Sequence, residues 1–165
     1  MRKLLVLLSI AALFGSCTKY KDGPTISFRS AEKRLTGKWK IESITLNDAD
    51  VTAAYQSAGL DIFPYSIYRD WSSQYYIGIA DTDANVIAKS NLKISHKKDV
   101  ISFCMVAEET YATVAGAIFA QISALNVQTD WEILRLKNDE LWIKTKLETN
   151  NYEIKFKLIA DYSDY

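Results

Sequence analysis

Side chains that could do acid–base or metal chemistry are few in this sequence, and they are scattered. The one histidine, His96, lies in a lysine-rich segment. A metal site needs several converging ligands, and a hydrolytic triad needs a histidine beside a nucleophile and an acid. Ser95 precedes His96, but adjacent residues of a strand point to opposite faces. The glycines form no phosphate-binding loop. We therefore expect no enzyme, no metal site and no cofactor, and interpret His96 as a solvated turn residue.

Cysteine chemistry is better defined at the N-terminus. Met1-Arg2-Lys3 is a basic start, residues 4–14 are an uncharged apolar run, and Gly15-Ser16-Cys17 closes the run with small residues. This order is typical of a secretory signal, and the run is shorter than the ~20 residues that span a bilayer. The ending Phe14-Gly15-Ser16-Cys17 resembles a bacterial lipobox. The resemblance implies cleavage before Cys17 and acylation of its thiol and new amino group. The alternative is an ordinary cleaved signal followed by a cysteine.

Acylation of Cys17 would make the chain a membrane-anchored lipoprotein of the cell envelope, since several acyl chains on one residue supply the two lipid signals that stable anchoring takes. Residues 18–22 lack the acidic cluster that marks surface export in some Gram-negative groups. We therefore predict an outer-membrane lipoprotein that faces the periplasm rather than the cell surface. Residues 1–16 are then a signal peptide, residues 17–29 a lipidated tether, and residues 30–165 the folded domain.

Length and charge limit the partners of this domain. Removal of residues 1–16 leaves 149 residues, enough for one domain with a proper core. The 20 basic and 20 acidic side chains become 18 and 20 after loss of Arg2 and Lys3, a net charge of −2. No long run of one sign occurs, so we expect no nucleic-acid partner. Cys104 then has no disulfide mate, and its apolar neighbours predict a buried strand residue.

Alternation of apolar and polar side chains predicts antiparallel strands over most of residues 35–160. Trp39 and Ile41 share one parity, whereas Ile44 and Leu46 have the other. A bulge near Ser43 would put all four on one face. Further strands are predicted at 74–80, 86–95, 100–106, 127–136, 141–148 and 152–158, and an eighth near Tyr65. An antiparallel barrel is built from strands that have one apolar face toward the core and one polar face toward solvent.

Gly37-Lys38-Trp39 resembles the Gly-x-Trp strand that opens many lipocalins. Small lipocalin-like lipoproteins of Gram-negative bacteria are similar, because this tripeptide follows soon after their lipidated cysteine and precedes a run of antiparallel strands. The resemblance covers about residues 35–160 in architecture, and only Gly37 and Trp39 match as a motif. It implies an all-β, mainly antiparallel, lipocalin-like up-and-down β-barrel of about seven or eight strands, of the kind that holds an apolar ligand.

Residues 108–125 change to the helical period and predict one internal helix. Glu108 and Glu109 sit in its first turn, where the helix dipole favours acids, and no charged side chain occurs from residue 110 to 129. The face opposite the apolar stripe is a row of small residues: Ala112, Gly116, Ala120 and Ala124. A lipocalin usually carries its helix after the barrel strands. We therefore expect this helix either to plug or cap the barrel, or to be a docking face.

Functions of different classes follow from these patterns. The first is a non-enzymatic binding module for a small apolar or aromatic-stacking ligand. Its candidate contacts are Trp39, Tyr75, Phe103, Trp131 and Phe156 inside the barrel, with Tyr65, Tyr68 and Trp71 at the mouth. The alternatives are a filled core for the inner set and a covering loop for the outer set. The second function is an accessory subunit of an outer-membrane protein complex that docks through helix 108–125. A third is a hydrolase inhibitor that uses the aromatic-rich loop containing Tyr65, Tyr68 and Trp71.

Overall fold

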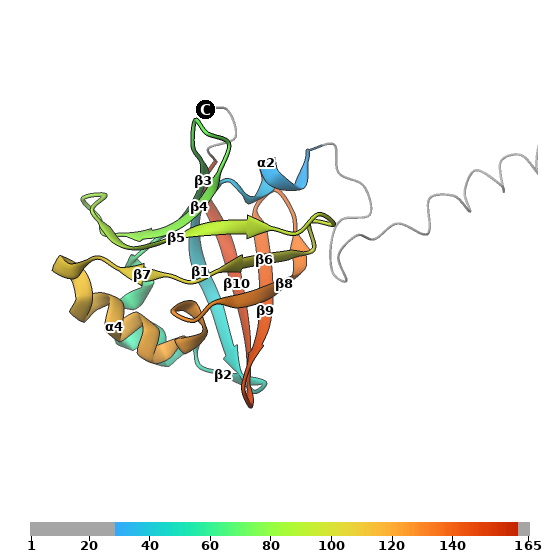
Figure 1. Cartoon of the computed structure of the whole chain (residues 1–165). Coiled ribbons are helices and arrows are strands. Elements are labelled where there is room, and N and C mark those ends of the chain that lie inside the picture. The colour runs from blue at the N-terminus through green and yellow to red at the C-terminus, as the bar shows by residue number, and fades with distance from the viewer. Residues whose placement is uncertain (1–28, 162–165) are drawn as a thin grey trace, which may run out of the picture.

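The computed structural model describes residues 29–161, so the predicted signal peptide, Cys17 and tether up to residue 28 lie outside the described residues, as do residues 162–165. Along the chain the elements are α2 (Ala31–Leu35), β1 (Gly37–Leu46), β2 (Ala49–Asp50), α3 (Thr52–Ser57), the 3₁₀ turn η1 (Leu60–Ile62), β3 (Tyr65–Arg69), β4 (Tyr75–Ala80), β5 (Val86–Ile94), β6 (Val100–Phe103), β7 (Val106–Ala107), η2 (Glu109–Tyr111), α4 (Ala112–Gln121), η3 (Ser123–Leu125), β8 (Thr129–Leu136), β9 (Glu140–Leu147) and β10 (Asn150–Asp161) (Figure 1).

Eight of these strands form a closed antiparallel up-and-down barrel. The order around the sheet is β10-β9-β8-β6-β5-β4-β3-β1, and β1 pairs with β10 to close it. The short β2 forms a hairpin with β1, and β7 pairs with β5 beyond the point where β6 ends. The predicted barrel class is confirmed, and the eighth strand predicted near Tyr65 is β3.

Two of the register shifts in the sheet account for the changes of parity in β1 and β8. The register between β1 and β10 shifts between Ile41 and Ser43, so Trp39 and Ile44 are both buried despite their opposite parity. A second shift lies in β8 at Leu134, between the residues that pair with β9. A bulge adds one residue on one strand and turns the following side chains to the other face. The bulge predicted near Ser43 and the single change of parity in residues 127–136 are therefore confirmed.

Helical segments cover both ends of the barrel. The α2 end comprises α2 and the turns 70–74, 95–99 and 137–139; there Leu35 is buried, and the Trp39 indole N–H donates to its carbonyl oxygen at 2.9 Å. The α4 end comprises α3, α4 and the turns 81–85 and 148–149, with Tyr55 of α3 and Ile118 of α4 in the core. The predicted internal helix is thus confirmed, as a continuous run of η2 and α4 followed by η3.

Two local predictions are wrong. The β9–β10 hairpin turns at Glu148 and Thr149, with Glu148 at φ 55°, so the strand predicted at 141–148 ends at Leu147 and the strand predicted from residue 152 begins at Asn150. Cys104 is half-buried in the break between β6 and β7, where its thiol donates to the carbonyl oxygen of Asn126 at 3.2 Å. The next residue along the chain, a methionine, occupies the core position instead.

Gly37 should be essential for closure of the barrel. Its φ is +155°, and a Cβ there would lie 2.5 Å from Leu158 Cδ1 and 2.8 Å from the Ala160 carbonyl oxygen. We expect Gly37→Ala to lower the free energy of unfolding by about 1–3 kcal/mol, measured by urea denaturation. Gly116→Ala is the matched control, because a Cβ there meets no atom within 4 Å and alanine stabilises a helix by about 0.5–1 kcal/mol. Equal effects of the two substitutions would contradict this account.

Candidate functional site

The aromatic side chains predicted inside the barrel fill it. Trp39, Phe103, Trp131 and Phe156 are all buried. The rings of Phe103 and Trp131 stack with centroids 5.8 Å apart, and Phe156 meets Tyr65 edge to face at 5.4 Å. The cavity that Trp39, Tyr65, Phe156 and neighbouring aliphatic side chains line is about 10 Å³, roughly the volume that one water molecule needs. The described interior is therefore a packed core.

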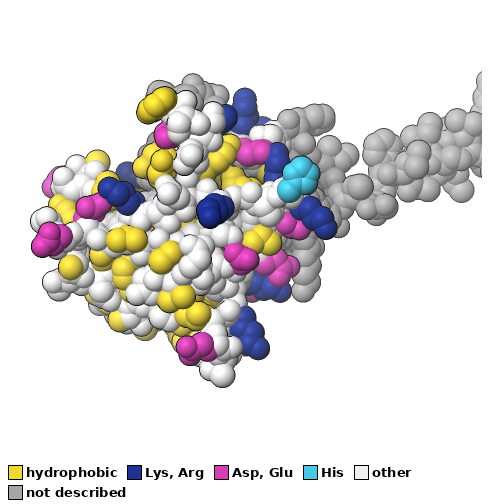
Figure 2. Space-filling model, viewed as in Figure 1, with side chains coloured by type: hydrophobic (Ala, Val, Ile, Leu, Met, Phe, Trp, Pro, Cys, Tyr) yellow, Lys and Arg dark blue, Asp and Glu magenta, His cyan; other side chains and the backbone are white. Residues whose placement is uncertain are grey.

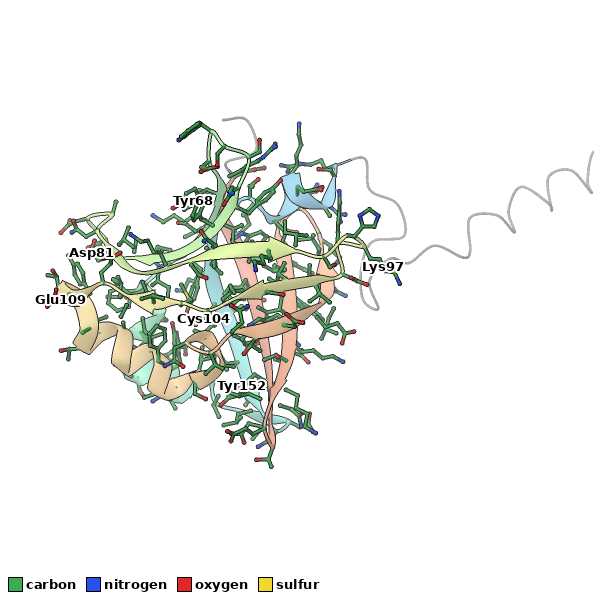
Figure 3. The ribbon with its side chains drawn as sticks, viewed as in Figure 1. Tyr68, Asp81, Lys97, Cys104, Glu109 and Tyr152 are labelled. Carbon is green, nitrogen blue, oxygen red and sulfur yellow. The ribbon has the colours of Figure 1, made fainter. Side chains whose placement is uncertain are left out.

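The aromatic residues predicted at the barrel mouth lie in three different places. Tyr65 points into the interior, and Tyr68 lies on the outer wall, where its ring stacks on Tyr76 at 5.5 Å (Figure 3). Trp71 lies in the turn between β3 and β4 at the α2 end and is 97% exposed. Tyr75, predicted inside, is half-buried at the same end. These residues do not make one common surface.

Helix α3 closes the α4 end through a pair of buried tyrosines. The hydroxyl oxygens of Tyr55 and Tyr65 lie 3.4 Å apart. Burial raises the pKa of Tyr55 to about 12 and raises the pKa of Tyr65 well above its ordinary value. Both hydroxyls therefore stay neutral and share a hydrogen bond in an otherwise apolar interior. A ligand could reach this space only if α3 or α4 moved away.

Side-chain contacts hold the α4 segment at both ends. Before the helix, the Tyr111 hydroxyl donates to Asp81 Oδ2 at 3.2 Å. After it, the hydroxyl oxygens of Ser123 and Tyr152 lie 2.8 Å apart. Figure 3 shows Asp81 and Tyr152 at the two ends of the helical segment. Because α4 is fixed to β10 and to the β4–β5 turn, it forms a preorganised surface.

The outward face of α4 is exposed and uncharged. Ala112, Gly116 and Ala120 of the predicted docking row are exposed, with Thr113 and Ala117 beside them. The fourth member of the row, Ala124, is buried in the core and takes no part in this face. The inner face buries Ala115 and Ile118. The helix thus caps the barrel with one side and presents small uncharged side chains with the other.

Exposed valines extend the uncharged surface beside α4. Val106 of β7, which packs on α4, is 65% exposed, and Val127 follows η3 and is 41% exposed. Figure 2 shows hydrophobic and uncharged side chains over this part of the molecule, with acidic side chains at its outer edge. Lys89 and Glu108 at that edge form an ion pair of 2.7 Å. We call Ala112, Gly116, Ala117, Ala120 and Val106 the α4 surface.

A polar groove on the outer wall was not predicted from the sequence. It measures about 600 Å³ and is lined by Thr45, Asp48, Val100, Asp130, Glu132, Lys144, Thr145, Lys146, Asn151, Tyr152 and Glu153. Acidic and basic groups alternate there, and Lys144 pairs with Glu132 at 3.2 Å. In the sequence, most of these residues look like the solvent-exposed polar positions of ordinary strands, so nothing marks them as a groove. Because the groove is lined by both acidic and basic side chains, its charge favours neither an anionic nor a cationic ligand.

The fold defines the architectural class of the described chain. The described chain is a closed eight-stranded antiparallel barrel, an architecture consistent with a lipocalin-like fold. No protein-family model and no curated protein sequence matches the chain. Within residues 29–161, no three His, Cys, Asp or Glu side chains are grouped so that they could hold a metal ion. The described helices are all too short or too polar to cross a membrane.

The tyrosine pair predicts a loss of stability at alkaline pH. An unfolded tyrosine ionises near pH 10, whereas folded Tyr55 stays protonated up to about pH 12. The folded state then binds more protons than the unfolded state between these values, so the free energy of unfolding falls as pH rises. We expect a shallower fall for Tyr55→Phe, measured by urea denaturation from pH 9.5 to about 12. A variant with the wild-type slope would contradict the burial of this hydroxyl.

Proposed function

We propose that the chain is a lipid-anchored, non-enzymatic envelope protein that serves as an accessory subunit of an outer-membrane protein complex and docks through the α4 surface. The observation that carries the proposal is the uncharged, exposed face of a helix that is fixed at both ends. Interface centres are depleted of charged side chains. Small residues such as Ala112, Gly116 and Ala120 let a partner approach the helix backbone closely.

The position of α4 supports this role. Residue 29 enters the domain at α2, and α4 lies away from α2 across the barrel (Figure 1). A chain anchored through Cys17 would therefore keep the α4 surface away from its own attachment point. On this proposal the protein is a lipocalin-like lipoprotein of the outer membrane that faces the periplasm. Its barrel serves as a rigid support for the docking helix.

Binding of a small apolar ligand inside the barrel stays a prediction of the lipocalin resemblance. It would require movement of α3 or α4, because the closed interior has room for about one water molecule. An inhibitor role through the aromatic loop has less support, since Tyr65, Tyr68 and Trp71 face in different directions. Docking is the proposed function that needs no rearrangement of the barrel.

Ala120→Glu tests the docking surface. The substitution adds a charge to an exposed helix position, so the free energy of unfolding should change by less than about 0.5 kcal/mol. Burial of an unpaired charge in an interface should reduce recovery of a partner cross-linked to the full chain at least about tenfold. Ala49→Glu on exposed β2 is the matched control and should leave recovery unchanged. If both variants recover the same partners, docking takes place on another surface. If Ala120→Glu unfolds the domain, Ala120 belongs to the core.

Cys17→Ser tests the anchor. If Cys17 carries the acyl chains, the variant should lose its acyl mass and leave the membrane fraction of cells, because the tether has no other lipid signal. The chain's other cysteine supplies the control, since Cys104→Ser should stay in the membrane fraction. Fractionation and mass spectrometry of the intact protein give both readings. A Cys17→Ser chain that keeps the acyl mass of the wild type would refute the lipid anchor.

A further inference from the structure

Trp71 is presented to solvent by a tightly bonded turn. The Asp70 carboxylate accepts hydrogen bonds from the Ser72 hydroxyl at 2.7 Å and from the Gln74 backbone N–H at 2.8 Å. The Asp70 N–H also donates to the Gln74 carbonyl oxygen at 2.9 Å, and Ser73 has a φ of 70°. The turn is thus ordered by its own bonds while the indole of Trp71 stays 97% exposed.

The turn that carries Trp71 lies beside the place where the tether enters the domain. Figure 1 shows the β3–β4 turn, α2 and the β5–β6 turn grouped at one end of the barrel. An ion pair joins Lys98 of the β5–β6 turn to Glu32 of α2. The ring of Tyr75, at the start of β4, has the Arg69 guanidinium 5.8 Å from its centroid. Three segments that are distant in sequence therefore make one surface at the α2 end.

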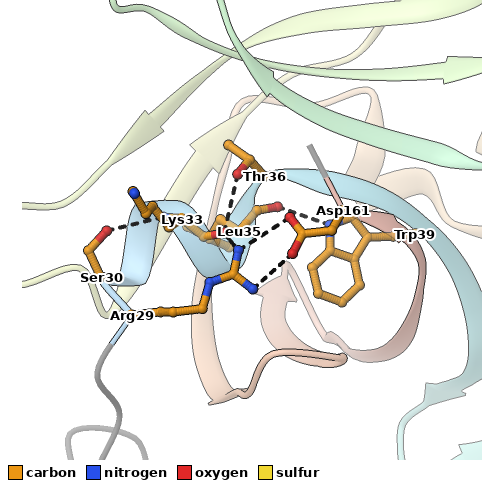
Figure 4. A network of polar contacts seen from close by, with 7 residues as sticks. All are labelled: Arg29, Ser30, Lys33, Leu35, Thr36, Trp39 and Asp161. Atoms are coloured by element: carbon orange, nitrogen blue, oxygen red, sulfur yellow. Dashed lines mark hydrogen bonds and ion pairs between the residues drawn. The ribbon is translucent and has the colours of Figure 1, made fainter. Parts of the chain in front are cut away.

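A bidentate ion pair fixes the entrance of the tether on this surface. The Arg29 guanidinium donates to both carboxylate oxygens of Asp161, at 2.8 and 3.3 Å, and to the Lys33 carbonyl oxygen at 3.1 Å (Figure 4). Residues 17–28 number twelve, and even a fully extended chain of that length reaches only about 40 Å. A lipid on Cys17 would therefore keep the α2 end within about 40 Å of the bilayer.

The charges of the α2 end complement an anionic surface. Lys33, Arg69 and Lys97 are exposed, and no ion pair is recorded for them with any residue between 29 and 161. Of the acids at this end, Glu32 pairs with Lys98 and Asp161 with Arg29, whereas the Asp70 carboxylate is bonded to Ser72 and Gln74 within its own turn. Figure 3 shows Lys97 at the outer tip of its turn. Basic side chains near a membrane are attracted to anionic headgroups, and tryptophan is enriched at the interface between lipid and water.

We propose that the α2 end lies directly on the lipid bilayer, with Trp71 inserted at the level of the headgroups and Lys33, Arg69 and Lys97 against anionic lipids. This inference rests on the proposed anchor at Cys17. It adds a second contact with the same membrane, so that the anchored domain has a fixed orientation. The α4 surface then points away from the bilayer, toward the partner of the proposed complex.

Tryptophan fluorescence of the mature, full chain in vesicles tests the inference. The vesicles contain phosphatidylcholine and phosphatidylglycerol, with or without bromine on the phosphatidylcholine acyl chains, which quenches nearby indoles. Trp39 and Trp131 are buried in the barrel, and Trp142 lies on its outer wall between Arg135 and Lys155. Brominated lipid should therefore quench wild-type emission, and Trp71→Phe should lose that quenching. Trp142→Phe is the matched control and should keep it.

Flotation of the same vesicles separates failure of the anchor from failure of this inference. A chain that does not float refutes the anchor and the inference together. If the chain floats but brominated lipid does not quench Trp71 and acrylamide still reaches it, only the inference is refuted. The β3–β4 turn would then be a candidate for contact with a protein. Quenching should also be weaker in vesicles of phosphatidylcholine only. Equal quenching in both kinds of vesicle would overturn the role given to Lys33, Arg69 and Lys97.

Discussion

The volume enclosed by eight strands is the constraint on which this structure depends. A barrel of this size is just wide enough to be filled by side chains or to hold one small ligand. Here the stacked rings of Phe103 and Trp131 and the tyrosine pair of Tyr55 and Tyr65 take up the space. Helices α3 and α4 contribute core residues at one end and α2 at the other, so helical segments cover both ends of the described barrel. On the proposed function, recognition by this domain takes place on its outer surfaces.

On the proposed function and membrane orientation, the two ends of the barrel make different contacts. The α2 end carries the fixed entrance of the tether, the exposed indole of Trp71 and uncompensated cations, which suits a contact with lipid. The α4 end carries a helix with an uncharged face, which suits a contact with protein. The barrel wall between the two ends bears ion-paired side chains of both signs, which are well solvated by water. A rigid barrel keeps the two contacts at a constant separation, and this is a use of the fold that needs no internal ligand.

The spacing of apolar residues in the sequence predicted the strands, the bulge near Ser43 and the internal helix. These features depend on which side chains share a face, and the spacing records that. It did not reveal where each aromatic residue lies along the barrel axis, so Tyr65 and Trp71 were grouped although they belong to an interior strand and to a turn at the α2 end. Ala124 shows the same limit: it continues the row of α4 by count, but the helix has ended and the chain enters the core. Strand ends were placed less well: β10 begins at Asn150 because Asn150 and Asn151 bond to Asn47 in the neighbouring β1–β2 turn.

The pairing of β1 with β10 has a consequence for how the chain matures. Gly37 pairs with Asp161, so the first strand meets its partner only when the last strand is available. Contacts between residues so far apart in sequence form slowly, because the ends of a long loop must first be brought together. Every shorter nascent segment has two unpaired strand edges, which are prone to join other chains. A polypeptide of this topology therefore keeps unpaired strand edges until its C-terminal strand is available to close the barrel.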